Sequence, residues 1–285
     1  MSLEYNIVYK AENVYDHPVK EARWQFLIIP EENNNQKLES ISFKNSMDFP
    51  HEFSTNAYGY KTIRIRAKAP FEAISFEASF KVLKEPSNPF DFILPISQED
   101  EYSEYQKLQF KVDYEPFLRK TPLTSLLGNH NNFFEYQHDK FVFENLQELN
   151  KWVFEKIFYT PGATDVNTTL DEMLEHRKGV CQDFAHLFCA IARKYGIPCR
   201  YVSGYLHQGN GFFGDSQMHA WTEAYIEDVG WIGFDPTNNL IANENHIKVA
   251  HGKDYSDCSP LKGILYSKGG NTTNHSVQVH GEQQQ

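Results

Sequence analysis

The 285-residue sequence has few of the features that membrane, secreted or nucleic-acid-binding proteins share. No run of about 18 apolar residues is present, so no membrane-spanning helix is expected. The first residues show no basic segment followed by an apolar one, so we expect no signal peptide. The formal net charge is −11 and no basic face is evident. Because phosphate binding needs clustered cations, the sequence predicts no nucleic-acid partner.

Cysteine is also scarce, with four residues at positions 181, 189, 199 and 258. They form no CxxC pair and no spacing typical of a small disulfide-linked domain. We therefore expect free thiols and a reduced, cytoplasmic location. Cys189 and Cys199 are predicted to be buried, and Cys258 to be exposed in a loop.

The first part of the chain has the alternating pattern of β-strands. Large apolar side chains recur at every second position in residues 21–28, 61–67 and 73–82. Strands at this spacing, without helical periodicity between them, favour a small antiparallel sandwich. A proline-containing and acidic segment follows at 86–101. We place a domain boundary near residue 115, which gives a β-rich domain (1–115) and a second domain (116–285).

The second domain begins with three predicted helices. The first starts at Asn145 and the second is capped by Thr168. The third ends at Gly196 and Pro198, and its apolar stripe places Cys181 in or just before its first turn. A thiolate at that position is stabilised by the unpaired N–H groups of the helix start.

Strands are predicted after the third helix, at 200–205, 218–226 and 231–235, and a final one at 275–280 is expected to extend the same sheet. His219 lies on the second of these strands and Asp235 ends the third. If the hairpin between them has an odd number of loop residues, Asp235 lies opposite Trp221 and shares a face with His219. Glycines at 209, 211 and 214 predict a flexible loop beside the site.

Cys181, His219 and Asp235 are the residue types that an activated thiol requires. The thiolate attacks a carbonyl carbon, the histidine donates a proton to the leaving amine, and the aspartate orients the imidazole. The backbone N–H of Cys181 is a predicted oxyanion donor, and Gln182 is a candidate for the second. Each residue alone is more often structural, but their joint arrangement favours catalysis.

Several motifs resemble the transglutaminase-like superfamily: YTPGAT at 159–164, RKGVCQDFAH at 177–186, RYVSGY at 200–205, HAW at 219–221 and FDPT at 234–237. The early segment YDHPV at 15–19 resembles the β-rich region often fused to that domain in bacteria. The resemblance implies an α+β fold with a papain-like core of helices packed on an antiparallel sheet, preceded by a β-sandwich domain. It also implies a Cys181, His219 and Asp235 triad, with no metal or organic cofactor.

Three functions agree with these patterns. The first is a cysteine hydrolase that cleaves peptide or isopeptide amides of a peptide or protein substrate through a thioester. The second is an acyltransferase in which an amine intercepts the thioester, but Gln182 occupies the position where the animal crosslinking enzymes have Trp. The third is a non-catalytic peptide-binding protein with the same fold.

Overall fold

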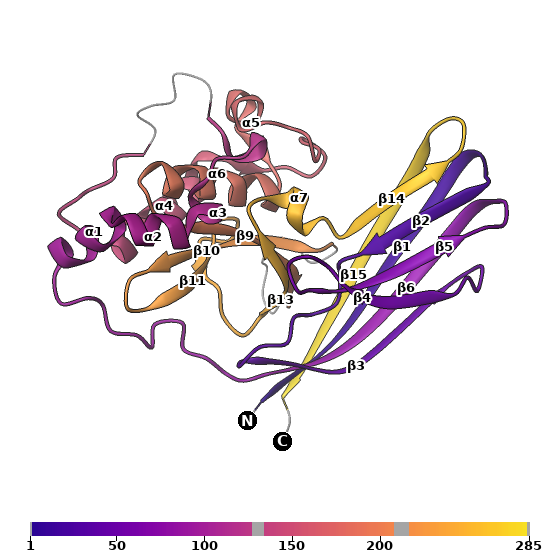
Figure 1. The fold of residues 1–285 in the computed structure, drawn as a ribbon, viewed down its shortest axis with the longest axis horizontal. Coiled ribbons are helices and arrows are strands. Elements are labelled where there is room, and N and C mark those ends of the chain that lie inside the picture. Colours follow the sequence, from indigo (N-terminus) through magenta and orange to yellow (C-terminus); the bar gives the residue numbers. More distant parts are fainter. Residues whose placement is uncertain (1, 127–133, 208–216, 284–285) are drawn as a thin grey trace.

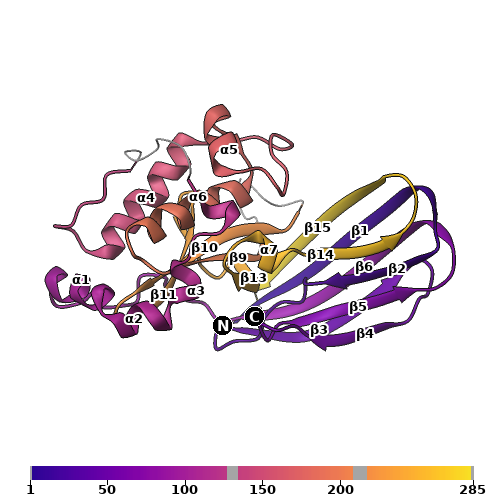
Figure 2. The same ribbon diagram turned by 45° about the horizontal axis from the view of Figure 1, so that its top comes forward.

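The computed structural model describes residues 2–126, 134–207 and 217–283, so the predicted glycine-rich loop at 209–214 lies outside the described residues. A β-sandwich forms one side of the molecule, and a sheet covered by helices forms the other (Figure 1). The two ends of the described chain meet within one sheet, where Leu3 pairs with Gln283. The same two-part arrangement is seen in the turned view of Figure 2.

The sandwich consists of two antiparallel four-stranded sheets. In spatial order, the first contains β15 (Asn271–Gln283), β1 (Leu3–Val19), β6 (Phe71–Lys84) and β3 (Gln36–Asn45). The second contains β14 (Leu261–Tyr266), β2 (Glu21–Phe26), β5 (Lys61–Ala67) and β4 (His51–Thr55). Buried and exposed side chains alternate along β1 and β6, so one face of each strand packs inward. Phe26 and Phe76 meet between the sheets with ring centroids 4.9 Å apart.

Two sandwich strands come from the end of the chain, because β14 pairs with β2 and β15 pairs with β1. The prediction that the last strand extends the sheet of the second domain is therefore wrong. The alternation of Val277 and Val279 correctly marks a strand, but strand periodicity does not specify which sheet a strand joins. Here Tyr9 and Ile7 lie opposite these valines. The β-rich part of the molecule is consequently not confined to residues 1–115.

The segment before residue 115 is helical, whereas the sequence analysis expected strands up to that point. α1 (Gln98–Gln106) begins after Ser97, whose side chain accepts a hydrogen bond from the N–H of Asp100. α2 (Leu108–Asp113) follows directly. Tyr105 and Phe110 are buried in the cluster formed by the helices of the second half, so this segment packs with that half and not with the sandwich.

The second half is an antiparallel five-stranded sheet with helices packed on it, and this confirms the predicted α+β class. Its spatial order is β12 (Leu240–Ile241), β11 (Gly230–Asp235), β10 (His219–Ile226), β9 (Cys199–Leu206) and β13 (His246–Gly252). The longest helices are α4 (Val142–Lys156) and α6 (Cys181–Lys194), and α6 packs on β9 and β10. The shorter elements are α3 (Glu115–Leu118), η1 (Pro122–Thr124), β7 (Phe158–Tyr159), α5 (Leu170–His176), β8 (Lys178–Gly179) and α7 (Tyr255–Cys258).

The core of the sandwich reaches into the other half of the molecule, which also has a core of its own. The sandwich cluster extends to Ala185 of α6 and to Tyr201 and Tyr205 of β9. The Tyr205 hydroxyl donates a hydrogen bond to the backbone oxygen of Ile28 at 2.6 Å. Because these apolar contacts and this buried hydrogen bond cross the junction, the sandwich has a defined position beside the start of α6.

Within the described part of the chain, no helix combines the length and the apolar character needed to cross a bilayer.

Candidate active site

Cys181 is the first residue of α6, as the sequence analysis predicted. The preceding Val180 has an extended backbone, and its N–H donates to Oδ2 of Asp183 at 2.8 Å, which caps the helix start. Cys181 is partly exposed. The backbone N–H groups of Cys181 and Gln182 have no hydrogen-bond partner among the described residues. The helix start therefore offers two free donors next to the thiol.

Asp183 also holds the loop that borders the site. Its Oδ2 accepts a second hydrogen bond from the Thr164 hydroxyl at 2.6 Å. Burial raises the pKa of this carboxyl group, and the two hydrogen bonds oppose that effect. Gly179 approaches the same side chain so closely that a Cβ at that position would lie 2.8 Å from it. The sequence analysis did not identify this connection, because Thr164 and Asp183 belong to separate segments.

His219 and Asp235 lie on neighbouring strands in the predicted register. Thr222 pairs with Phe234 and Ile226 pairs with Gly230, which leaves a three-residue turn and places Asp235 opposite Trp221. The odd loop length is confirmed. Nε2 of His219 lies 2.8 Å from Oδ2 of Asp235, and both side chains are fully buried.

The carboxylate of Asp235 has further partners that the sequence analysis missed. Its Oδ2 accepts hydrogen bonds from Nε2 of His246 at 3.2 Å and from Nδ2 of Asn238 at 2.8 Å. Its Oδ1 accepts from the backbone N–H groups of Thr237 and Asn238. His246 opens β13 and belongs to none of the motifs, so no local pattern signals its role. These donors fix the carboxylate in one orientation.

The charges of His219 and Asp235 stabilise each other. Burial alone would lower the pKa of His219, but the Asp235 carboxylate and the Cys181 thiol raise it to about 10. Burial alone would raise the pKa of Asp235, but His219 and His246 hold it well below its ordinary value. The structure thus favours a protonated imidazole beside an ionised carboxylate.

A cleft of about 320 Å³ brings the predicted residues together. Cys181, Gln182 and His219 line it, so the thiol is not sealed in the core. Nε2 of His219 is hydrogen-bonded to Asp235. Its other ring nitrogen, Nδ1, is buried without a hydrogen-bond partner in the described part of the chain. The Cys181 thiol contributes to the raised pKa of this ring, so it is the group that can pair with Nδ1.

His219, Asp235 and His246 also have the composition of a metal site, with candidate ligand atoms within 4.8 Å of one another. However, the N–H of Asn243 donates to Nδ1 of His246, which leaves the proton of that ring on Nε2. That proton points to Asp235, whose Oδ2 is also occupied by Asn238. The cluster therefore fits a hydrogen-bonded network better than a ligand set. The expectation that the protein uses no cofactor stays a prediction.

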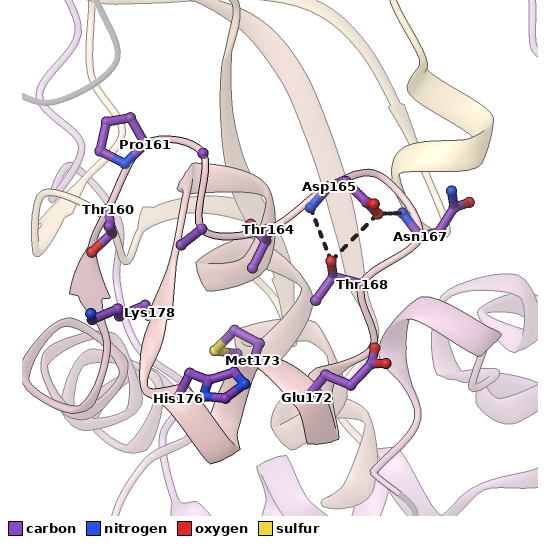
Figure 3. Close-up of a pocket in the computed structure, with 12 residues that line it drawn as sticks. Thr160, Pro161, Thr164, Asp165, Asn167, Thr168, Glu172, Met173, His176 and Lys178 are labelled. Carbon is purple, nitrogen blue, oxygen red and sulfur yellow. Dashed lines mark hydrogen bonds between the residues drawn. The ribbon is translucent and has the colours of Figure 1, made fainter.

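A second cavity, of about 710 Å³, adjoins the cleft (Figure 3). The two share Thr164 and Asp165 as lining residues. Asp165 shapes the loop, since its Oδ1 accepts hydrogen bonds from the N–H of Asn167 and the hydroxyl of Thr168.

The three remaining cysteines are fully buried. For Cys189 and Cys199 this confirms the prediction, and their sulfur atoms lie 3.5 Å apart as free thiols. For Cys258 the predicted exposure is wrong. Its segment forms the short helix α7, which packs on β9 and β13 and buries the thiol near the backbone of Tyr201.

Comparison with known proteins agrees with this geometry. Residues 131–236 match the model of the Transglutaminase-like superfamily. An uncharacterised protein of Mycobacterium leprae is 41% identical over 133 residues, which cover 45% of this chain and 47% of that protein. A protein-glutamine gamma-glutamyltransferase of Pseudomonas aeruginosa is 32% identical over 130 residues, which cover 41% of this chain and 20% of that protein. The matched regions thus span less than half the length of these relatives.

One solved structure matches over the whole chain. It is that of a candidate cysteine protease of Cytophaga hutchinsonii, with a TM-score of 0.79 and 21% sequence identity, covering 100% of this chain and 92% of that one. At this identity the match establishes the shared fold, including the sandwich. The family match and the motifs within it show a transglutaminase-like domain at residues 131–236, which contains Cys181, His219 and Asp235.

Proposed function

We propose that the protein is a cysteine hydrolase that cleaves peptide or isopeptide amide bonds through a thioester. The observation that carries this proposal is the state of the His219 ring. Its Nε2 is bound to Asp235, while its Nδ1 is unpaired in a cleft that also contains the partly exposed Cys181. Most buried polar atoms in proteins have a hydrogen-bond partner, so an unpaired Nδ1 beside a thiol is unusual for a histidine with a purely structural role.

The chemistry follows from this arrangement. The Cys181 thiolate adds to the amide carbonyl carbon, and the free N–H groups at the start of α6 stabilise the oxyanion that forms. His219 donates its Nδ1 proton to the amine nitrogen, the C–N bond breaks, and the amine leaves. Water then gives a proton to His219 and attacks the thioester, which releases the acid and restores the thiolate. Throughout the reaction, the Asp235 carboxylate keeps the imidazole ring of His219 oriented and stabilises its positive charge.

Acyl transfer is the second candidate. In that reaction a primary amine takes the place of water at the thioester. The similarity to a protein named as a glutamyltransferase favours it, although that match covers only part of both chains. Gln182, which follows the nucleophile, favours hydrolysis, because the crosslinking enzymes have Trp at this position. For both reactions we propose a peptide or protein substrate, and for the free thiols a reducing cytoplasm.

Three proteins test the proposal: the wild type, Cys181→Ala and His219→Asn. Each is incubated with fluorescein-labelled casein, with and without dansylcadaverine as an amine donor. We expect peptide release by the wild type and at least about a thousandfold loss in both variants, as for other nucleophile and base replacements. Amine incorporation without peptide release would favour the transferase.

Alkylation of Cys181 by iodoacetamide separates activation from exposure. Cys181 is the one partly exposed thiol of the four, so preferential labelling alone proves little. The informative comparison is His219→Asn, in which Cys181 stays exposed but loses its imidazole partner. We expect labelling to slow by about tenfold or more. Equal rates in this variant and the wild type would contradict the proposed role of His219.

A further inference from the structure

The β-sandwich supplies two aromatic side chains to the cleft that holds Cys181. Tyr9 comes from β1 and His275 comes from β15. In the register of these strands Val277 lies opposite Tyr9 and Ala11 opposite His275, so both rings project from the same face of the sheet. That face forms the interior of the sandwich, where the ring of Tyr9 meets Phe26 of the second sheet, and it also reaches the other half of the molecule, where Phe80 meets Tyr205 of β9.

A hydrogen bond joins the two side chains, with 3.0 Å between Oη of Tyr9 and Nδ1 of His275. Tyr9 is almost completely buried, whereas His275 is exposed toward solvent. Among the described residues, neither the Tyr9 hydroxyl nor Nε2 of His275 has another hydrogen-bond partner. Nε2 is therefore the nitrogen of this ring that remains available.

The proton positions follow from this pairing. Burial raises the pKa of Tyr9 and lowers the pKa of His275, so both groups are neutral at pH 7. If Nδ1 carried the ring proton, the buried Tyr9 hydrogen would have no acceptor, which is unfavourable. Tyr9 therefore donates to Nδ1, and the ring carries its proton on Nε2. The result is a neutral N–H donor on a residue that lines the cleft.

We propose that His275 binds the substrate by donating a hydrogen bond from Nε2 to one of its carbonyl oxygens. A peptide presents such acceptors at every residue, and a neutral donor suits a neutral carbonyl. This inference rests on the proposed function in one respect, namely that the substrate is a peptide or protein. It makes the sandwich a part of the substrate-binding site, contributed by the last strand of the chain.

The free protein provides the first test. The ¹⁵N spectrum of histidine-labelled full-length protein distinguishes a protonated from an unprotonated ring nitrogen. For His275 we expect Nε2 to be protonated in the wild type and the preference to weaken in Tyr9→Phe. A proton on Nδ1 in the wild type would overturn the inference, whatever the activity of the protein.

The second test measures kcat/KM on fluorescein-labelled casein. We expect His275→Phe to lower it about tenfold, which is the size of one lost hydrogen bond, and His275→Gln, which keeps an N–H donor, to recover most of it. The matched control is His280→Phe. His280 is on the same strand, exposed, and directed to the opposite face. Iodoacetamide labelling of Cys181 at the wild-type rate shows that each variant keeps its site intact.

The outcomes separate the two proposals. If Cys181→Ala is inactive but His275→Phe matches the wild type, the His275 inference fails and the hydrolase stands. If the wild type itself does not cleave casein, the hydrolase is in doubt, and binding of the labelled casein to Cys181→Ala decides the role of His275. Binding weakened by His275→Phe supports the inference, and unchanged or undetectable binding contradicts it.

Discussion

Nε2 of His246 lies 3.2 Å from Oδ2 of Asp235, the same carboxylate oxygen that is hydrogen-bonded to Nε2 of His219. The N–H of Asn243 on Nδ1 of His246 fixes the donating tautomer. Burial lowers the pKa of His246, so it acts as a neutral donor. The predicted aspartate is thus held by a residue from a strand outside the sequence motifs.

Replacing His246 tests this positioning role. We expect His246→Phe to lower kcat about tenfold through loss of one hydrogen bond to Asp235, with KM unchanged because His246 does not line the cleft. His246→Gln keeps a donor and should recover most of kcat. Steady-state kinetics on labelled casein measures both effects. If both variants lose activity equally, or KM rises, His246 acts through general packing instead.

The His219 and Asp235 pair predicts how stability depends on pH. The pKa of His219 is raised from 6.5 to about 10, so the stability that its protonation provides is complete below pH 6.5 and is lost as the pH rises toward 10. The pKa of Asp235 is lowered, so its contribution is present above pH 3.8 and declines as the pH falls further. Urea unfolding from pH 4 to pH 10 should show a decline above about pH 6.5. Asp235→Asn should flatten that decline, and an unchanged slope would show that another group causes it.

Thr164 connects the loop at the edge of the cleft to α6. Thr164→Val keeps the shape of the side chain but removes its hydrogen bond to Asp183, so we expect a loss of about 2 kcal/mol in the free energy of unfolding. KM should rise severalfold, because this loop, drawn in Figure 3, contributes Thr164 and Asp165 to the lining of both cavities.

Thr160→Val is the matched control for that experiment. Thr160 lies in the same loop, and its hydroxyl bonds to the backbone oxygen of Phe158 instead of to α6. Urea unfolding and steady-state kinetics compare the two variants. Equal stability and equal KM would mean that the bond to Asp183 does not hold the loop.

The site could be predicted from the sequence where its geometry depends on local patterns. The apolar stripe of α6 and its end at Gly196 and Pro198 placed Cys181 at the helix start, because helix periodicity and end signals are local. For Asp235 the sequence left two choices of face, one for an odd and one for an even loop length, and the structure has the odd loop that places it opposite Trp221.

Long-range pairing could not be predicted in the same way. The alternation of Val277 and Val279 marks a strand, and this strand pairs with β1. The apolar alternation of β1 has the same period as that of any other strand, so the sequence does not single it out as the partner. For this reason the sequence did not predict that His275 lines the cleft or that His246 bonds to Asp235. The predicted exposure of Cys258 was wrong for a related reason. Whether a short polar segment is buried depends on its packing against distant strands, here β9 and β13.

The most direct test of the mechanism is the covalent state of Cys181 during turnover. Wild-type protein is mixed with casein peptides, quenched in acid, digested and examined by mass spectrometry, with Cys181→Ala as the control. We predict a peptide acyl group bound to the sulfur of Cys181 as a hydroxylamine-sensitive thioester, and neither adduct nor turnover in the variant. Turnover that proceeds in Cys181→Ala, or an acyl group found on another residue, would contradict the proposed enzyme.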